Sequence, residues 1–302
     1  MSSRYLAHGL LGLGVLMIST SSILVRFAQT EGLSSLSIAA LRLGLAALLL
    51  TPLALARASR EIMALSGRDL GLALVAGGLL AAHFAAWISS LAYTSVASST
   101  ALVTTNPIWI ALASMLIFRE RFNRVLVTAI AIAVGGSALI FFADNSSAGR
   151  AQPNPLLGNT LALLGAITVS AYLLIGRLLR QKLSLLAYIW LIYSSCAALL
   201  IAVALVAGQP LWGFSPWGWA LLLGLALGPQ LLGHTTINWA LKHVSTTFIA
   251  LTILGEPIGS ALLAWLLFGE GFSALQSCGF VALLTGIYLA ARNERNSQFS
   301  AD

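Results

Sequence analysis

The sequence predicts an all-α polytopic membrane protein with ten transmembrane helices, arranged as two inverted five-helix repeats whose termini are both cytoplasmic. Three observations carry this prediction: an apolar composition, a segment that occurs twice, and an uneven distribution of basic residues. Of the 302 residues, 59% are hydrophobic and 8% are charged, and the mean hydropathy is +0.93. Because soluble domains contain roughly a quarter charged residues, this composition argues against a water-soluble fold.

A segment of the first half recurs in the second half at a constant separation. The first copy begins at Ser95 and reads SVASSTALVTTNPIWIALASMLIFRERF, and the second begins at Ser245 and reads STTFIALTILGEPIGSALLAWLLFGEGF. Pro107 thereby corresponds to Pro257, a separation of 150 residues (257 − 107), and Glu120 corresponds to Glu270. The chain is therefore predicted to consist of two copies of one unit.

Apolar runs recur along the whole chain, each long enough to cross a hydrocarbon core of about 30 Å as a helix. The expected helices span residues 6–28, 34–57, 70–92, 96–118, 123–142, 156–177, 184–207, 217–240, 245–268 and 273–292.

One segment near the middle of the chain, residues 144–155, reads DNSSAGRAQPNP and breaks helical periodicity with Asn, Ser, Gly and Pro. The expected organisation is a first five-helix repeat at 1–145, an external linker at 146–155, a second inverted repeat at 156–292 and a cytoplasmic tail at 293–302.

The basic residues test this arrangement, because Lys and Arg are retained on the cytoplasmic side of a membrane. With the N-terminus inside, thirteen of the sixteen Lys and Arg residues fall in cytoplasmic segments. They are Arg4, Arg57, Arg60, Arg68, Arg119, Arg121, Arg124, Arg177, Arg180, Lys182, Lys242, Arg292 and Arg295. The external loops hold Arg150 alone, while Arg26 and Arg42 lie within spans. Five helices per repeat is an odd number, so the second copy enters the membrane from the opposite side.

This architecture indicates a transporter. Two halves related by a pseudo-two-fold axis in the membrane plane can open a central site first to one side and then to the other. An enzyme is not expected, because the sequence contains no H-E-x-x-H motif, phosphate-binding glycine loop or evident catalytic triad. No metal or cofactor is expected either, since Cys196 and Cys278 have no second ligand at a suitable spacing. The charge of +7 is spread over short loops, so no nucleic-acid partner is expected.

The paired motifs NPIW…FRERF and EPIG…FGEGF are each followed by a helix that contains glycine, at Gly135 and Gly136 and at Gly286. They resemble the EamA-type repeats of the drug/metabolite transporter superfamily, and the likeness covers residues 5 to 292. Within it the chain is most similar to YddG-like bacterial exporters. That resemblance implies a multi-pass protein of the bacterial inner membrane that exports amino acids, aromatic ones included. A drug or amphipathic-compound efflux carrier and a lipid flippase of the same fold are the alternatives.

Polar residues within spans are expected to face the bundle or a wet cavity, because lipid exposure is costly. His83, Trp87 and Ser90 follow an i, i+4, i+7 spacing, which places them on one helical face. A second set recurs every four residues in the eighth span. Each residue can equally serve to hydrogen-bond one helix to another. The expected substrate-binding residues are His83, Trp87, Ser90, Asn106, Tyr172, Gln230, His234 and Asn238.

The two repeated prolines and one acidic residue are the remaining candidates. Pro107 and Pro257 each remove a backbone donor within a predicted span, so they are expected to bend the helices and to act as hinges or gates. Glu256 is the carboxyl residue placed deepest in a span, where it needs either a charge partner or a bound proton. It is a candidate for proton coupling, and a structural hydrogen bond between helices is the alternative.

Arg42 lies in the outer part of the second predicted span, where two interpretations remain open. Its guanidinium can receive a substrate carboxylate in a bidentate manner. It can also reach outward to the membrane surface or bind backbone carbonyls, which the sequence favours. Gly135 and Gly136 are both interpreted as sites of close helix packing.

Overall fold

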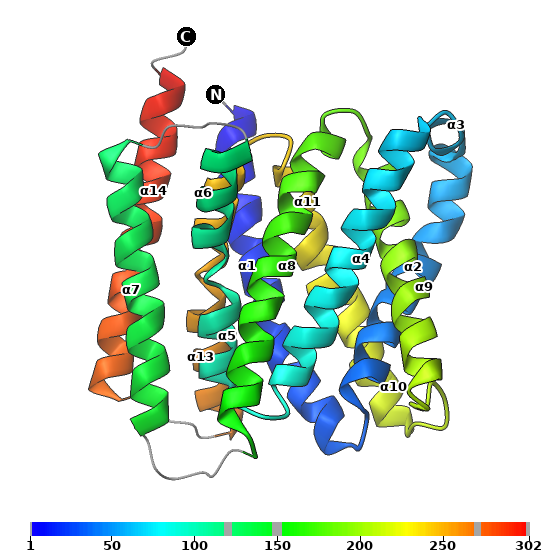
Figure 1. Ribbon diagram of the computed structural model, residues 1–302, viewed down its shortest axis with the longest axis horizontal. Coiled ribbons are helices and arrows are strands. Elements are labelled where there is room, and N and C mark those ends of the chain that lie inside the picture. The colour runs from blue at the N-terminus through cyan, green and yellow to red at the C-terminus, as the bar shows by residue number, and fades with distance from the viewer. Residues whose placement is uncertain (1, 118–122, 147–152, 269–272, 300–302) are drawn as a thin grey trace.

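The computed structural model describes residues 2–117, 123–146, 153–268 and 273–299, and the regular elements in these ranges are all helices (Figure 1). The helices lie side by side as a bundle, and both chain termini lie at the same end of it (Figure 1). Most of the expected linker falls outside these ranges. So do five residues on which the predicted repeat and topology rest: Arg119, Glu120, Arg121, Arg150 and Glu270.

The helices follow the order of the predicted spans. Those of the first repeat are α1 (Ser2–Thr30), α2 (Ser35–Arg57), α3 (Ser59–Met63), α4 (Gly67–Ser90), α5 (Val96–Val103), α6 (Asn106–Ile117) and α7 (Arg124–Ser146). Those of the second are α8 (Pro155–Arg180), α9 (Leu185–Val206), α10 (Pro216–Leu225), η1 (Ala226–His234), α11 (Thr235–Ala240), α12 (Thr246–Ile253), α13 (Glu256–Phe268) and α14 (Ala274–Phe299).

Many of these helices begin at a short polar side chain. The residue before the helix accepts a hydrogen bond from the backbone N–H three positions on, which satisfies one of the free donors of the first turn. The capping residues are Ser34, Ser66, Ser95, Asn154, Ser184, Ser215 and Ser245. These caps fix where an apolar run becomes a helix.

Within the described residues, eight helical segments are long and apolar enough to cross a membrane. They comprise α1, α2, α4, α5 with α6, α8, α9, α10 to α11, and α12 with α13. The helices α7 and α14 contain shorter apolar stretches, Arg124–Leu139 and Ser277–Leu289. The prediction of a multi-pass membrane protein is confirmed, and the ninth and tenth crossings stay predictions.

Two of the predicted spans are broken, each just before its repeated proline. The span 96–118 divides into α5 and α6 at residues 104–105, and the span 245–268 divides into α12 and α13 at residues 254–255. Pro107 and Pro257 are thus the second residues of α6 and α13, where the missing N–H would have been free in any case. The prolines begin new half-helices, so the expected bend within one continuous helix is replaced by a break.

A third span, 217–240, continues as a helix but changes its type. Its central part, η1, is a π-helix that contains Pro229 and runs between the α-helical segments α10 and α11. Hydrogen bonds in a π-helix join residues five positions apart, so side chains turn around the axis differently than in an α-helix. The four-residue spacing on which the predicted polar face depended therefore does not hold here.

The two repeats interleave throughout the bundle. The first-repeat helix α4 packs on α8 and α9, α2 packs on α9, α1 packs on η1 and α13, and α7 packs along α14. In Figure 1, α1 starts at the end that holds both termini, whereas α8 starts at the opposite end. This is the direction expected of inverted repeats. Because most close packing joins one repeat to the other, the two halves of the sequence are not separate bodies.

Of the two adjacent glycines of α7, one is required for packing and the other is not. A Cβ built on Gly136 would lie 2.7 Å from the carbonyl oxygen of Gly279 on α14, whereas a Cβ on Gly135 meets nothing within 4 Å. Gly286 of α14 faces α7 in the same way, since its Cβ would lie 2.6 Å from the Cβ of Ala133. The joint interpretation of Gly135 and Gly136 as packing sites is wrong for Gly135.

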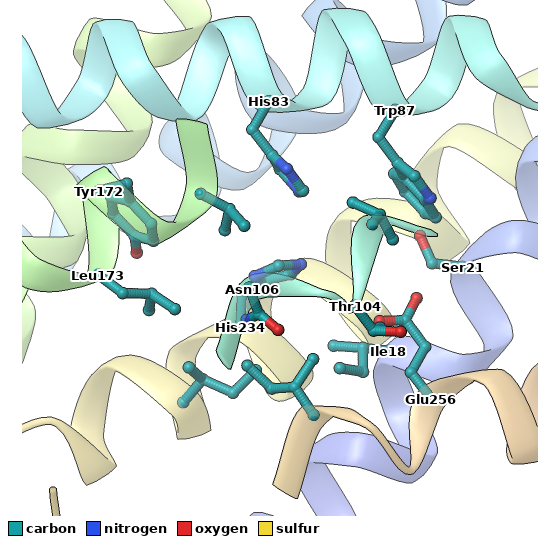
Figure 2. Close-up of a pocket in the computed structure, with 14 residues that line it drawn as sticks. Ile18, Ser21, His83, Trp87, Thr104, Asn106, Tyr172, Leu173, His234 and Glu256 are labelled. Carbon is teal, nitrogen blue, oxygen red and sulfur yellow. The ribbon is translucent and has the colours of Figure 1, made fainter. Parts of the chain in front are cut away.

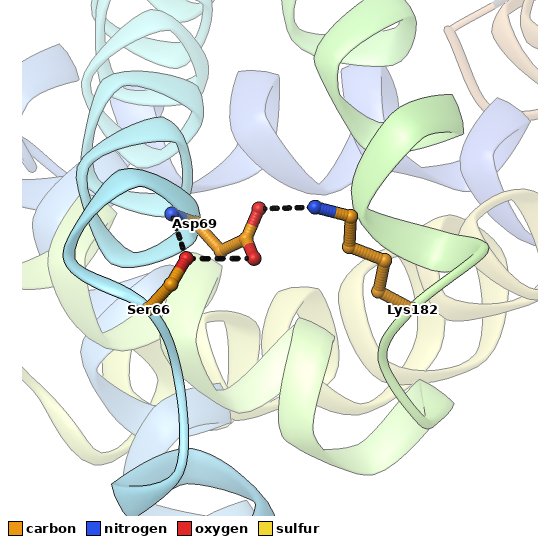
Figure 3. Close-up of polar contacts among 3 residues, drawn as sticks. All are labelled: Ser66, Asp69 and Lys182. Carbon is orange, nitrogen blue, oxygen red and sulfur yellow. Dashed lines mark hydrogen bonds and ion pairs between the residues drawn. The ribbon is translucent and has the colours of Figure 1, made fainter.

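An ion pair joins the two repeats at one end of the bundle (Figure 3). The ammonium group of Lys182, just after α8, donates to the carboxylate of Asp69 on α4 at 2.7 Å. The Ser66 hydroxyl donates to the other carboxylate oxygen at 2.9 Å and caps α4 through the Asp69 N–H. Nearby, the carboxylate of Glu61 on α3 accepts both the N–H and the hydroxyl of Ser184 at 2.6 Å.

We expect Lys182→Met to change stability by less than about 1 kcal/mol, because the Lys182 side chain is 61% exposed and solvent screens the pair. Ser66→Ala should lower the free energy of unfolding by about 1 kcal/mol, because it removes a helix cap. Its effect should therefore equal or exceed that of Lys182→Met. Thermal unfolding in detergent, compared among the two variants and the parent, measures both. A Lys182 effect clearly exceeding the Ser66 effect would contradict this order.

Candidate functional site

Side chains of the described helices line a small central cavity of about 40 Å³ (Figure 2). Side chains from α1, α4, α8, α11, η1 and both broken helices line it. The lining residues are Ile18, Ser21, His83, Trp87, Val103, Thr104, Asn106, Val169, Tyr172, Leu173, His234, Ile237, Ile253 and Glu256. Such a volume holds a few water molecules. A metabolite therefore needs the surrounding helices to move apart before it can bind.

His83 and Trp87 form one wall of the cavity, on α4. Their rings lie nearly parallel, 4° apart, with centroids separated by 6.2 Å. His83 Nδ1 lies 2.9 Å from the carbonyl oxygen of Gly165 on α8. Because a carbonyl can only accept, Nδ1 carries the proton, which leaves Nε2 of the neutral ring as an acceptor. The Trp87 indole Nε1 is a buried donor with no acceptor among the described residues.

Ser90, the third member of the predicted α4 face, serves another purpose. Its hydroxyl lies 2.6 Å from both the carbonyl oxygen of Trp87 and the hydroxyl of Ser99 on α5. Ser90 is fully buried and does not line the cavity. Its hydrogen bonds tie α4 to α5, which is the structural alternative that the sequence left open.

The breaks in the two repeated helices meet at the cavity. Asn106 and Glu256 are the first residues of the half-helices α6 and α13, and both side chains line the cavity. Helix N-termini carry partial positive charge, so the site combines two helix ends with one carboxyl group. The side-chain oxygen of Asn106 is buried and has no donor among the described residues. The carboxyl group of Glu256 points toward Ser21 and Thr104 (Figure 2).

The π-helix turns the three predicted residues of the eighth span toward three different places. His234 lines the cavity and packs edge-on against Phe84, with ring centroids 5.3 Å apart. Gln230 accepts a hydrogen bond from Arg42, and Asn238 accepts one from the hydroxyl of Tyr172 at 2.5 Å. Neither Gln230 nor Asn238 lines the cavity. The sequence spacing alone suggested one continuous face.

Tyr172 lines the cavity with its ring while its hydroxyl is directed away from it. Beyond Asn238 the hydrogen bonds continue to the hydroxyl of Tyr193, 3.2 Å from the Asn238 amide nitrogen, and on to Thr235 at 3.3 Å. This network holds α8, α9 and α11 together. It supports the cavity wall without leaving the Tyr172 hydroxyl free for a ligand.

Arg42 points into the bundle, which corrects the interpretation that the sequence favoured. The side chain is 0% exposed. Its Nε donates to Gln230 at 2.9 Å, its Nη1 donates to Ser21 at 2.7 Å, and its guanidinium lies 4.4 Å from the centre of the Phe84 ring. Its neighbours are side chains of α1, α4 and η1, so it neither reaches outward nor rests on backbone carbonyls.

Ser21 and Thr104 are cavity residues that the sequence analysis did not select. Ser21 belongs to a polar cluster in α1, residues 19–22, which read Ser-Thr-Ser-Ser within an otherwise apolar run. That cluster was a visible signal. Thr104 lies in the break between α5 and α6, and nothing in its sequence distinguishes it from the adjacent Thr105.

Comparisons with known proteins agree with this architecture. The sequence profile described as the EamA-like transporter family matches residues 6–142 and, separately, residues 156–292. A solved crystal structure superposes with a TM-score of 0.75 and covers 96% of this chain and 98% of its own, at 18% sequence identity. At that identity the likeness concerns the fold. No match was found among curated proteins.

Proposed function

Because this chain belongs to the EamA-like transporter family, we propose that it exports amino acids or similar small metabolites across a bacterial inner membrane, as YddG-like exporters do. The proposed topology has ten crossings with both termini in the cytoplasm, as the distribution of Lys and Arg indicates. The observation that supports this function best is the central cavity, which lies where the two broken helices meet. It contains polar groups that have no hydrogen-bond partner among the residues the structure describes.

The hydrogen-bond acceptors and the carboxyl group that line the cavity suit a substrate that carries an amine. His83 Nε2 and the side-chain oxygen of Asn106 can accept hydrogen bonds, and Glu256 can neutralise an ammonium group. The indole of Trp87 offers one donor and an aromatic surface. An α-amino group with a small side chain supplies the complementary donors and apolar contact.

Transport requires the cavity to expand and to open to alternate sides. Its present volume of about 40 Å³ is too small for an amino acid. We expect the breaks before Pro107 and Pro257 to act as hinges, since a break lets two half-helices move without disrupting either one. Because the repeats interleave, we expect each group of helices that moves together to contain helices of both repeats.

Efflux of amphipathic compounds is the second candidate. The cavity wall includes several apolar side chains, which favour a substrate with an apolar part. They are Ile18, Val103, Val169, Leu173, Ile237 and Ile253. An amphipathic cationic dye therefore belongs in the same transport experiment as the amino acids.

The test is transport by purified protein in liposomes. We expect flux of radiolabelled amino acids above that of empty vesicles, and about a tenfold loss in Trp87→Ala, because losing about 1.4 kcal/mol of binding changes affinity tenfold. His83→Ala should also lower the flux, because it removes the Nε2 acceptor beside Trp87. Trp217→Ala, at a tryptophan that is 57% exposed, is the matched control and should transport normally.

Two results would count against the proposal. Absence of amino acid flux over empty vesicles would exclude the amino acid exporter, and dye flux in its place would favour the efflux carrier. Equal loss of transport in the Trp87 and Trp217 variants would contradict the proposal that the cavity binds the substrate.

A further inference from the structure

Arg42 is a charge buried among neutral groups. Its hydrogen-bond partners, the Ser21 hydroxyl and the Gln230 side-chain oxygen, carry no charge. No carboxylate of the described residues lies at ion-pair distance from it, and Glu256 acts on it only through space. A buried guanidinium without a counter-charge is strongly unfavourable, because the surrounding dipoles replace its hydration only in part. A bound anion would supply the missing opposite charge.

The donors around Arg42 are incompletely used. Since Arg42 Nε can only donate, the Gln230 amide must face it with its oxygen, so the amide nitrogen points elsewhere. That nitrogen lies beside the Tyr193 hydroxyl, but no acceptor of the described residues meets it in hydrogen-bond geometry. Arg42 Nη2 has none either, and both side chains are 0% exposed. Within the described part of the chain, two buried donors on neighbouring side chains therefore lack an acceptor, which is the arrangement that a carboxylate satisfies.

Ser21 links Arg42 to the cavity. Ser21 lines the cavity and also accepts the hydrogen bond from Arg42 Nη1 at 2.7 Å. This small side chain therefore lies where Arg42 adjoins the cavity. Phe84, whose ring covers one face of the guanidinium, also contacts the cavity residue His234, so it holds Arg42 beside the site.

We propose that Arg42 and Gln230 form an anion subsite at the cavity wall that receives the carboxylate of the transported molecule when Ser21 turns aside. This inference rests on the proposed function and narrows its substrate class. The molecule carries a carboxylate at one end, bound by Arg42 and Gln230, and an amine at the other, bound by Glu256 and Asn106. Amphipathic cations without a carboxylate are poor substrates.

The test compares acids with their uncharged counterparts in liposomes. The common amino acids are offered as free acids and as carboxamides, and the parent protein should prefer the acids by about tenfold to a hundredfold. Arg42→Gln should lose that preference. Parent protein that transports the acid and amide forms equally well would overturn the subsite while leaving the carrier in place. Parent protein that transports neither form would instead overturn the proposed function.

A second variant, Gln230→Glu, tests whether Arg42 and Gln230 bind substrate or only stabilise the bundle. Its result does not depend on whether Arg42→Gln folds. The new carboxylate lies against Arg42 and occupies the subsite, so the variant should fold at least as stably as the parent and yet lose acid transport by about tenfold or more. If Arg42 and Gln230 only hold helices together, the added ion pair leaves transport unchanged, which would overturn the proposal. Gln209→Glu, the same exchange in the loop after α9, is the control and should transport normally.

Discussion

Glu256→Gln should abolish substrate accumulation driven by a pH gradient while exchange of substrate between the two sides persists. Glu256 begins α13, lines the cavity and is 7% exposed. A carboxyl group in such a place changes its charge when a proton binds, and the low dielectric makes that change energetically large. Glutamine keeps the shape and one acceptor but cannot bind or release a proton. The coupling of transport to the proton gradient is therefore lost, while the cavity keeps its shape.

The charged and titratable groups around Glu256 must be considered in this experiment. His83 and His234 line the same cavity, and Arg42 lies behind its wall. Uptake into liposomes is measured with an imposed pH gradient and at equal pH on both sides. Glu31→Gln is the control, because Glu31 accepts a hydrogen bond from Ser215 at an exposed site. Full pH dependence and full accumulation in the Glu256 variant would remove the proton-coupling role and leave the structural one.

Substituting alanine at two adjacent glycines of α7 should change stability in opposite directions. Gly136→Ala places a Cβ 2.7 Å from the Gly279 carbonyl oxygen and 2.9 Å from the Leu283 backbone nitrogen, and backbone atoms cannot yield as a flexible side chain does. Overpacking of this kind costs about 1–3 kcal/mol. Gly135→Ala meets nothing within 4 Å and should stabilise α7 by up to about 1 kcal/mol, because alanine favours a helix over glycine.

Thermal unfolding of both variants in the same detergent measures this difference. Gly286→Ala provides a second view of the interface, since its Cβ would lie 2.8 Å from the Ala129 carbonyl oxygen of α7. It should destabilise the protein as Gly136→Ala does. Equal stability of the Gly135 and Gly136 variants would mean that α7 and α14 do not pack closely in the membrane.

The local features of the fold were predictable because they depend on residues close together in the chain. Apolar runs give the helices, and Ser34, Ser66 and Ser184 mark where three of them begin. The repeated segment gives the duplication, which the family match confirms over residues 6–142 and 156–292. The break before each proline was only partly predictable, since a proline in a span is compatible with a bend or with a new helix.

The π-helix η1 shows where sequence spacing fails. Gln230, His234 and Asn238 were placed on one face by counting four residues per step, but the altered winding directs them to Arg42, to the cavity and to Tyr172. Whether a helix relaxes into a π-helix depends on its neighbours, here α1 and α2, which pack against it. The residues within η1 do not by themselves reveal this change.

The sequence by itself determined the membrane class, the duplication, the approximate helix ends and the presence of polar residues at depth. The tertiary structure alone decided how the repeats interleave, which polar residues share a cavity, and that Arg42 points inward against Ser21 and Gln230. The reason is that lipid and protein interior are equally apolar, so an apolar pattern does not tell which helix face meets which. That choice is made by packing between helices far apart in the chain.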